Sequence, residues 1–184
     1  MKILAFAGSN SSTSINKKLV THTTSFFDEH SVEILDLNDY EMPLFSVDKI
    51  AKSGMPQLAV DFANKIDESD FLFMSLAENN GAYTTAFKNI YDWISVIPDR
   101  KAFGDKPVFV LATSPGPRGG ASVLDLAKNT LPFYGGNVVE TFSLPSFYEN
   151  FNDETGITSD NLFTNLMTKI ETLKSTLSLM KNDN

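Results

Sequence analysis

The chain of 184 residues, 42% of them hydrophobic, is long enough for one well-packed domain and short for two. It contains no cysteine, which excludes disulfides, thiolate chemistry and iron–sulfur ligation. Its two histidines, His22 and His30, share one helix-like segment and favour neither a metal site nor a serine–histidine triad. Fifteen basic against 23 acidic residues give a net charge of −8, which disfavours nucleic acids and anionic membrane surfaces as partners.

No stretch approaches the roughly 20 apolar residues of a membrane span. The N-terminus has one lysine and a short apolar run, a pattern that predicts a strand and not a signal peptide. We therefore expect a cytoplasmic protein. Because the net charge repels anions, an anionic ligand would have to be held by local dipoles and hydrogen bonds.

Short apolar runs, which predict strands, alternate with longer segments of helical periodicity. This alternation predicts a parallel sheet covered by helices on both faces. We expect a single α/β domain, 1–184, with a three-layer doubly wound fold around a five-stranded parallel sheet. In chain order the expected elements are strand 2–8, helix 14–30, strand 32–37, helix 55–69, strand 71–76, helix 84–95, strand 107–114, helix 120–136, strand 137–144 and helix 159–181.

Three loops of this arrangement are candidates for a ligand site. Such sheets bind ligands at the carboxyl ends of their strands, near the point where the strand order reverses. The loops after the first, third and fourth strands, GSNSSTSIN (8–16), LAENNGAYTT (76–85) and TSPGPRGGAS (113–122), are all rich in small, hydrogen-bonding residues. Their coincidence predicts one composite site.

The first loop combines hydroxyl and amide donors with the start of a helix, whose unpaired N–H groups and partial positive charge suit a phosphate. It is not a Walker A loop, which needs a second glycine followed by Lys and Ser or Thr. It is not a dinucleotide fingerprint either, because Gly8 is its only glycine. A site for one terminal monophosphate remains, with a plain helix cap as the alternative, since caps favour the same residues.

The second loop offers the carboxyl and amide groups of ENN (78–80) and a flexible Gly81 before a helix begins at Thr84 or Thr85, although a turn and an N-cap explain it equally well.

The third loop has two prolines and three glycines, so parts of its backbone can approach a flat ring. Its Arg118, the one cation of the three loops, fits a phosphate, a substrate anion, a subunit contact or a solvated surface position. No carboxylate pair or base–nucleophile couple stands out, which favours chemistry supplied by a cofactor. Flavin mononucleotide, with one phosphate, a polyol chain and a flat ring, satisfies all three loops.

The chain resembles the NAD(P)H-dependent FMN reductase family, flavodoxin-like proteins that include quinone, azo-dye and chromate reductases. GSNSSTSIN is similar to the family's Gly-Ser-x-Arg-x-x-Ser-x-Asn phosphate loop. AENNGAYTTAFKNIYDW is similar to Pro-Glu-Tyr-Asn-Gly-Ser followed by Leu-Lys-Asn-x-x-Asp-Trp, and SPGPRGG to the glycine-rich loop after the fourth strand. FNDETGITSD (151–160) resembles the acidic turn before the last helix. The resemblance spans almost the whole chain and implies a flavodoxin-like sheet with strand order 2-1-3-4-5.

The resemblance implies an FMN-dependent NAD(P)H oxidoreductase that passes hydride from a nicotinamide through bound FMN to flavin, quinone or a similar acceptor. Such an enzyme would be a homodimer or homotetramer, with its chemistry on flavin N5, no catalytic side chain and no metal. Ser9, Ser14 and Asn16 would hold the phosphate, and the second and third loops would border the isoalloxazine. The cofactor-binding residues implied are Ser9, Ser11, Ser14, Ile15, Asn16, Ala77, Glu78, Asn79, Asn80, Gly81, Ser114, Pro115, Gly116 and Gly119.

Two positions depart from the family pattern. Ser11 stands where the family has arginine, which removes a charge-assisted phosphate contact, and Asn79 stands where it has tyrosine, so the aromatic beside the flavin is missing. Both departures predict weaker retention of FMN. A flavodoxin-like electron carrier and a flavin-binding regulatory protein without turnover are the alternative functions, although KNIYDW resembles the reductase pattern and not that of the carrier.

Overall fold

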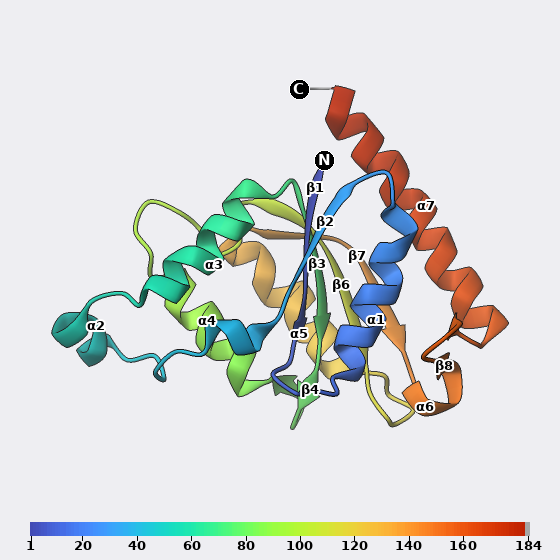
Figure 1. The fold of residues 1–184 in the computed structure, drawn as a ribbon, viewed down its shortest axis with the longest axis horizontal. Coiled ribbons are helices and arrows are strands. Elements are labelled where there is room, and N and C mark those ends of the chain that lie inside the picture. Colours follow the sequence, from blue (N-terminus) through green and yellow to red (C-terminus); the bar gives the residue numbers. More distant parts are fainter. Residues whose placement is uncertain (183–184) are drawn as a thin grey trace.

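The computed structural model describes residues 1–182, with side chains described as far as Ser178, and is built around a five-stranded parallel sheet (Figure 1). Its strands lie in the order β2-β1-β3-β6-β7, and every neighbouring pair is parallel. Counted along the chain within this sheet, that is the order 2-1-3-4-5 that the family resemblance implies, and it is confirmed. The strands are β1 (Lys2–Gly8), β2 (Ser31–Leu35), β3 (Phe71–Leu76), β6 (Lys106–Thr113) and β7 (Gly136–Leu144).

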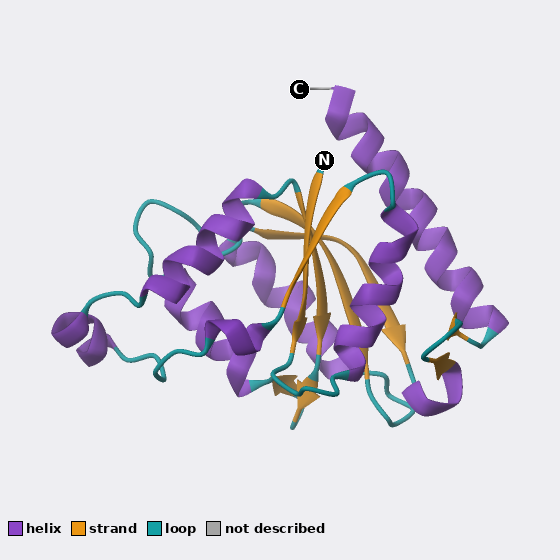
Figure 2. Ribbon diagram, viewed as in Figure 1, coloured by secondary structure: helices purple, strands orange, loops and turns teal. Residues whose placement is uncertain are grey.

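Helices cover both faces of the sheet and give the three layers that the sequence predicts (Figures 1 and 2). On one face lie α1 (Ile15–Thr24) and α7 (Asp160–Asn182). On the other lie α3 (Gln57–Glu68), α4 (Thr85–Ser95) and α5 (Ala121–Thr130). None of the helices within the described residues combines the length and the apolar character needed to cross a membrane.

Alternate residues of each strand enter two separate hydrophobic cores. In β1, Leu4 and Phe6 pack with α3, α4 and α5, whereas Ile3 and Ala5 pack with α1 and α7. This follows from the two-residue period of a strand, whose successive side chains point to opposite faces. Because both faces of the sheet are buried, the inner strands are apolar at nearly every position. Such continuous apolar runs are what predicted these strands from the sequence.

Two of the expected helices are shorter than predicted. The segment 14–30 is helical only to Thr24 and then tightens into a 3-10 helix, η1 (Ser25–Phe27). The hydroxyls of Thr23 and Thr24 donate to carbonyls of the preceding turn, a local competition that disfavours continuation of the helix. The segment 120–136 likewise passes into a second 3-10 helix, η3 (Leu131–Tyr134), which has a proline in its first turn.

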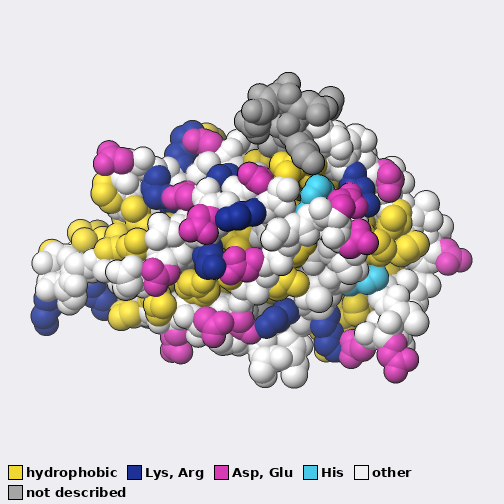
Figure 3. Space-filling model, turned by 45° about the horizontal axis from the view of Figure 1, so that its top comes forward, with side chains coloured by type: hydrophobic (Ala, Val, Ile, Leu, Met, Phe, Trp, Pro, Cys, Tyr) yellow, Lys and Arg dark blue, Asp and Glu magenta, His cyan; other side chains and the backbone are white. Residues whose placement is uncertain are grey.

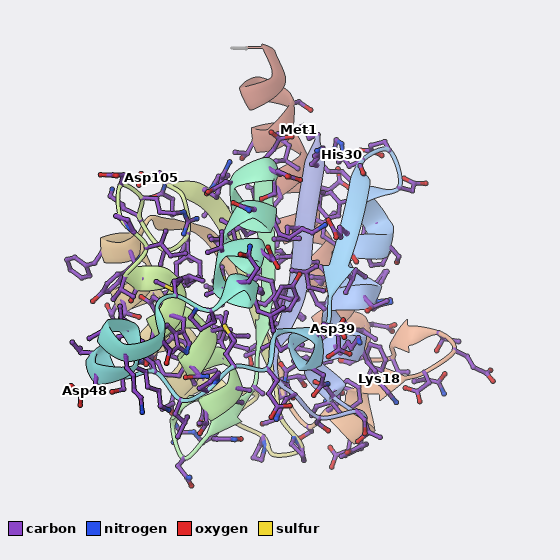
Figure 4. All side chains as sticks on the ribbon, turned by 60° about the vertical axis from the view of Figure 1, so that its left-hand side comes forward. Met1, Lys18, His30, Asp39, Asp48 and Asp105 are labelled. Atoms are coloured by element: carbon purple, nitrogen blue, oxygen red, sulfur yellow. The ribbon has the colours of Figure 1, made fainter. Side chains whose placement is uncertain are left out.

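Several short elements were not expected from the sequence. After β2 come a 3-10 helix, η2 (Leu37–Tyr40), and α2 (Val47–Ser53), which projects from the body and carries Asp48 (Figures 1 and 4). No residue of α2 is buried, so this helix has no apolar stripe that would reveal it. Two small antiparallel hairpins follow β3 and β7. Their strands are β4 (Glu78–Asn79) and β5 (Ala82–Tyr83) in one, and β8 (Phe151–Asn152) and β9 (Gly156–Ile157) in the other, the latter preceded by α6 (Phe147–Asn150).

The surface carries both signs of charge. On the face shown in Figure 3, acidic and basic side chains are interspersed and form no large patch of one sign. Figure 4 places Met1 and His30 at the amino-terminal end of the strands, away from Lys18 and Asp39, which lie toward the carboxyl end. The opposite ends of the sheet therefore present different groups, and the carboxyl end holds the predicted loops.

Candidate functional site

A cavity of about 250 Å3 opens at the carboxyl end of the sheet, between the loops after β1, β3 and β6. It brings the three predicted loops together. Of the predicted site residues, only Asn80, Gly81, Gly116 and Gly119 do not line it. Its walls are Ser9, Ser11, Thr13, Ser14, Ile15, Asn16, Ala77, Glu78, Asn79, Thr113, Ser114, Pro115 and Tyr148.

The first loop ends in a capped helix that faces this cavity. The Ser14 Oγ accepts a hydrogen bond from the Lys17 N–H at 3.1 Å, and the Ser14 carbonyl accepts one from the Lys18 N–H. The N–H groups of Ile15 and Asn16 lie earlier in the same turn, where a helix supplies no carbonyl to receive them. Both residues line the cavity, so these donors and the positive end of the helix dipole are directed to a ligand bound there.

The hydroxyls of Ser9, Ser11 and Thr13 bond to neighbours within the first loop. Ser9 Oγ accepts from the Ser11 N–H, Ser11 Oγ accepts from the Thr13 N–H, and the Ser11 and Thr13 hydroxyls share a hydrogen bond at 3.4 Å. The Ser9 O–H and one of the Ser11 and Thr13 O–H groups are left to donate. The loop is thus preformed by short-range bonds while its donors remain accessible.

Asn16 has a structural role that differs from the one the resemblance implied. Its side chain is 2% exposed and bonds across the sheet: Oδ1 accepts from the Ser75 hydroxyl at 2.9 Å and from the Thr113 N–H at 3.1 Å. Its Nδ2 donates to the Thr113 carbonyl at 3.2 Å. These three bonds tie the side chain to β3 and β6, so it holds the floor of the cavity.

The second loop is tied to both of its neighbours. The Glu78 carboxylate accepts from the Val123 N–H at 3.0 Å, in the first turn of α5. Thr84, the N-cap of α4, donates its hydroxyl to the Gly8 carbonyl at 2.9 Å. These two bonds fix the loop after β3 between the loops after β1 and β6.

Asn80 and Gly81 form the tip of the β4–β5 hairpin and not a wall of the cavity. Both have positive φ, 51° and 78°, as a type I′ turn requires, and Asn-Gly is the favoured pair for that turn. They are exposed, and nothing lies within 4 Å of a Cβ built on Gly81. Their contribution is to shape the hairpin that presents Glu78 and Asn79.

The third loop is held by the segment that follows β7. The Gly116 carbonyl accepts from the Gly119 N–H and the Ser146 N–H, and Ser143 donates its hydroxyl to the Gly119 carbonyl at 2.9 Å. A Cβ on Gly119, which has a φ of 57°, would lie 2.3 Å from Ser143 Oγ and 2.9 Å from the Pro145 nitrogen. Gly119 is therefore required for packing of this loop.

No lysine or arginine lines the cavity within the described part of the chain. The Lys17 ammonium pairs with Asp36 outside the cavity, and together with the Asn38 N–H it holds the pKa of the Asp36 carboxyl below its usual range. Arg118 donates to the Ser122 hydroxyl at 2.7 Å and is exposed. The anion-binding capacity of this site therefore rests on hydroxyls, backbone N–H groups and the helix dipole.

Three residues of the cavity were not predicted: Thr13, Thr113 and Tyr148. Thr13 lies between predicted residues of the first loop, and Thr113 ends the fourth apolar run, so position alone could have included both. Tyr148 comes from α6, beyond the last strand, and no motif in the sequence points to it.

A second cavity, of about 430 Å3, adjoins the first and shares Asn79 with it. It lies between the segment after β2 and the start of α4. The Asn89 amide anchors that segment, since it accepts from the Phe45 N–H and donates to the carbonyls of Met42 and Pro43. Trp93, which is 1% exposed, adds a bond from its indole N–H to the Pro43 carbonyl at 2.7 Å. The asparagine and tryptophan of KNIYDW are thus structural, and Trp93 belongs to the core.

The geometry suits a phosphate monoester that carries a flat ring. Donors without charge gather at the start of α1, and small or flat side chains, Ala77, Pro115 and Tyr148, lie on other walls of the same cavity. No group of three His, Cys, Asp or Glu side chains placed to hold a metal ion occurs among the described residues. The donor set therefore fits FMN.

Comparison with known proteins agrees with this geometry. The sequence profile of the NADPH-dependent FMN reductase family matches residues 1–149. A quinone reductase of Escherichia coli (strain K12) is 32% identical over 81 residues, which are 44% of this chain and 43% of that protein. An NADPH:quinone oxidoreductase of Arabidopsis thaliana is 27% identical over 132 residues, 70% of this chain and 65% of that protein. The aligned part of the chain thus spans less than two thirds of the length of either relative.

Among solved structures, the fold is similar to FerB, a flavoenzyme NAD(P)H:(acceptor) oxidoreductase from Paracoccus denitrificans. The TM-score is 0.74, and the alignment covers 93% of each chain at 22% sequence identity. At this identity the likeness shows the fold alone, and it agrees with the flavodoxin-like sheet order described above.

Proposed function

The chain belongs to the NADPH-dependent FMN reductase family, and from this premise we propose that it is an FMN-dependent NAD(P)H oxidoreductase. It would pass hydride from a nicotinamide to flavin, quinone or a similar small acceptor, and residues 1–184 would form one flavodoxin-like FMN-binding domain. The observation that carries the proposal is the cavity that joins the three loops, because its donors match a monophosphate and its other walls match a flat ring. When bound, FMN supplies the two-electron chemistry of its ring.

The proposal gives each group of residues a task. The hydroxyls of Ser9, Ser11 and Ser14, with the N–H groups of Ile15 and Asn16, bind the phosphate. The segments 77–79 and 114–115 border the ring and exclude water from it. Asn80 and Gly81 set the shape of the hairpin, and Gly116 and Gly119 set the path of the third loop. No side chain is assigned a proton-transfer step.

We further propose a cytoplasmic homodimer or homotetramer that acts on small molecules and binds neither nucleic acid nor membrane. Large apolar side chains stand exposed away from the cavity, Leu44 before α2 and Val47 on it, and their exposure supports a contact between subunits. The net charge of −8 supports small-molecule partners over nucleic acid.

The test is an absorption titration of the purified chain with FMN, followed by anaerobic addition of NADH or NADPH and then of a quinone. We expect saturable binding of FMN, bleaching by at least one nicotinamide, and recovery of the absorption with the quinone. The variant Ser9→Ala should weaken binding, whereas Ser12→Ala, which alters the same loop outside the cavity, should not. Binding without bleaching or turnover would identify an electron carrier or a regulatory protein and overturn the proposal.

A further inference from the structure

Among the described residues, Tyr148 is the one aromatic side chain that lines the cavity between the three loops. It is 73% exposed, whereas its neighbour Phe147 is 2% exposed. A large aromatic ring left open to water beside a cavity forgoes the stabilisation that burial would give it. Such a ring is a candidate contact for a ligand.

The backbone that carries Tyr148 is anchored to the wall of the cavity. The Phe147 N–H donates to the Ser114 carbonyl at 3.0 Å, and the Ser146 N–H donates to the Gly116 carbonyl at the same distance. The Phe147 ring stacks on Phe151, with 4.7 Å between the ring centroids, and so fixes α6 in the core. The base of the tyrosine is therefore held in place while its ring is free to meet a ligand, which lowers the entropic cost of contact.

The other residues of the site make such a contact valuable. The phosphate loop has no cation, and Asn79 stands at the position where the family pattern has an aromatic residue. The remaining side chains of the second and third loops in the cavity are small or polar: Ala77, Glu78, Thr113, Ser114 and Pro115. An aromatic face for a flat ring comes only from α6.

We propose that Tyr148 packs against the isoalloxazine ring of FMN and supplies binding energy that the uncharged phosphate loop lacks. This inference rests on the proposed function, since it takes FMN as the ligand of the cavity. It assigns a cofactor-contacting residue to a segment outside the three loops.

Affinity and fluorescence together test the proposal. FMN fluorescence is followed during titration of the wild-type chain, Tyr148→Ala and Tyr148→Phe. Loss of one aromatic contact should raise the Kd in Tyr148→Ala by about five- to tenfold. Tyr148→Phe should bind nearly as well as wild type, because its ring can still pack. A phenol in contact with a flavin quenches its emission by electron transfer and a phenyl ring does so far less, so bound FMN should be brighter in both variants.

Phe133→Ala is the matched control, because Phe133 is 80% exposed on η3 and does not line the cavity. It should change neither the Kd nor the fluorescence. If wild type binds FMN, and Ser9→Ala weakens that binding while Tyr148→Ala changes neither readout, the role of Tyr148 is wrong and the proposed function stands. If wild type does not bind FMN, the proposed function itself fails.

Discussion

The loop after β1 and the loop after β6 are both rich in small, hydrogen-bonding residues, but their polar groups have different kinds of partner. In the first, Ser9 and Ser11 bond only within the loop and leave hydroxyl donors exposed to the cavity. In the loop after β6, the carbonyls of Ser114 and Gly116 accept from the segment after β7, and the Gly119 carbonyl accepts from Ser143 at the end of β7. The loop after β1 therefore has hydrogen-bond donors for a ligand, whereas the loop after β6 is fixed in place as a wall of the cavity. The partners of the polar groups, more than their number, decide which loop does which.

The largest loss of stability should come from disturbing the loop after β6 at Gly119. In Gly119→Ala, the new Cβ would lie 2.9 Å from the Pro145 nitrogen at a φ of 57°. We expect the free energy of unfolding to fall by about 3 kcal/mol from strain and overpacking. Chemical denaturation measures it. Gly116→Ala is the control, since nothing lies within 4 Å of its Cβ; equal losses in both variants would contradict the assigned role of Gly119.

A slightly smaller loss of stability is expected at Asn16. Its side chain lies in the first loop but bonds to residues of β3 and β6. Asn16→Ala leaves the Thr113 N–H and carbonyl and the Ser75 hydroxyl buried without this partner. We expect a loss of about 2 kcal/mol or more in stability, present without FMN. Asn10→Ala, at an exposed position of the same loop, should cost under about 0.5 kcal/mol. A loss seen only with FMN present would argue that Asn16 acts through the ligand.

The next test adds a positive charge to the loop after β1, at the position where the family pattern has arginine. Ser11→Arg adds a cation at a residue that lines the cavity, and a charge-assisted bond to phosphate should lower the Kd for FMN by about tenfold. Ser12→Arg adds the same charge outside the cavity and should have a much smaller effect that salt removes. Calorimetric titration compares the two. Equal gains would mean that the general field, and not contact, holds the phosphate.

The smallest effect on stability should come from a buried polar atom that makes no hydrogen bond within the described residues. His22 Nε2 has no hydrogen-bond partner, and burial lowers the pKa of this imidazole from its usual 6.5. Below pH 6.5 the unfolded chain takes up a proton that the folded chain resists, so stability should fall as the pH drops from 7 toward 5. Thermal unfolding at several pH values should show a flatter profile in His22→Leu, which retains His30. A profile as steep as that of wild type would assign the loss to other groups.

The apolar runs of the sequence allowed prediction of the strands and the layers, most clearly for the inner strands, which are buried on both faces and apolar at nearly every position. The order of the strands was implied by the family resemblance. The sequence did not predict α2, in which no residue is fully buried and only Ile50 packs in part against the core. The β4–β5 hairpin was missed although Asn80-Gly81 is a strong turn signal, since its strands have only two residues each.

For the site, the sequence indicated the loops but not the direction of each side chain. Asn16 and Glu78 were both expected to face the cofactor, and both have partners on distant segments, Thr113 and Val123. Those partners become neighbours only through the order of the strands. Tyr148 was missed for the same reason, because nothing in its local sequence says that α6 returns to the first three loops.

The bond between Asn16 and Thr113 joins residues 97 positions apart. During synthesis the N-terminal part of a chain emerges first and begins to fold before the rest exists. The loop after β1 is thus complete as a peptide long before β6 can supply the floor of the cavity, and Glu78, 45 positions before Val123, has its partner only after β6 has been made. The pocket is a late product of translation, so cofactor loading belongs to the finished polypeptide and not to the nascent one.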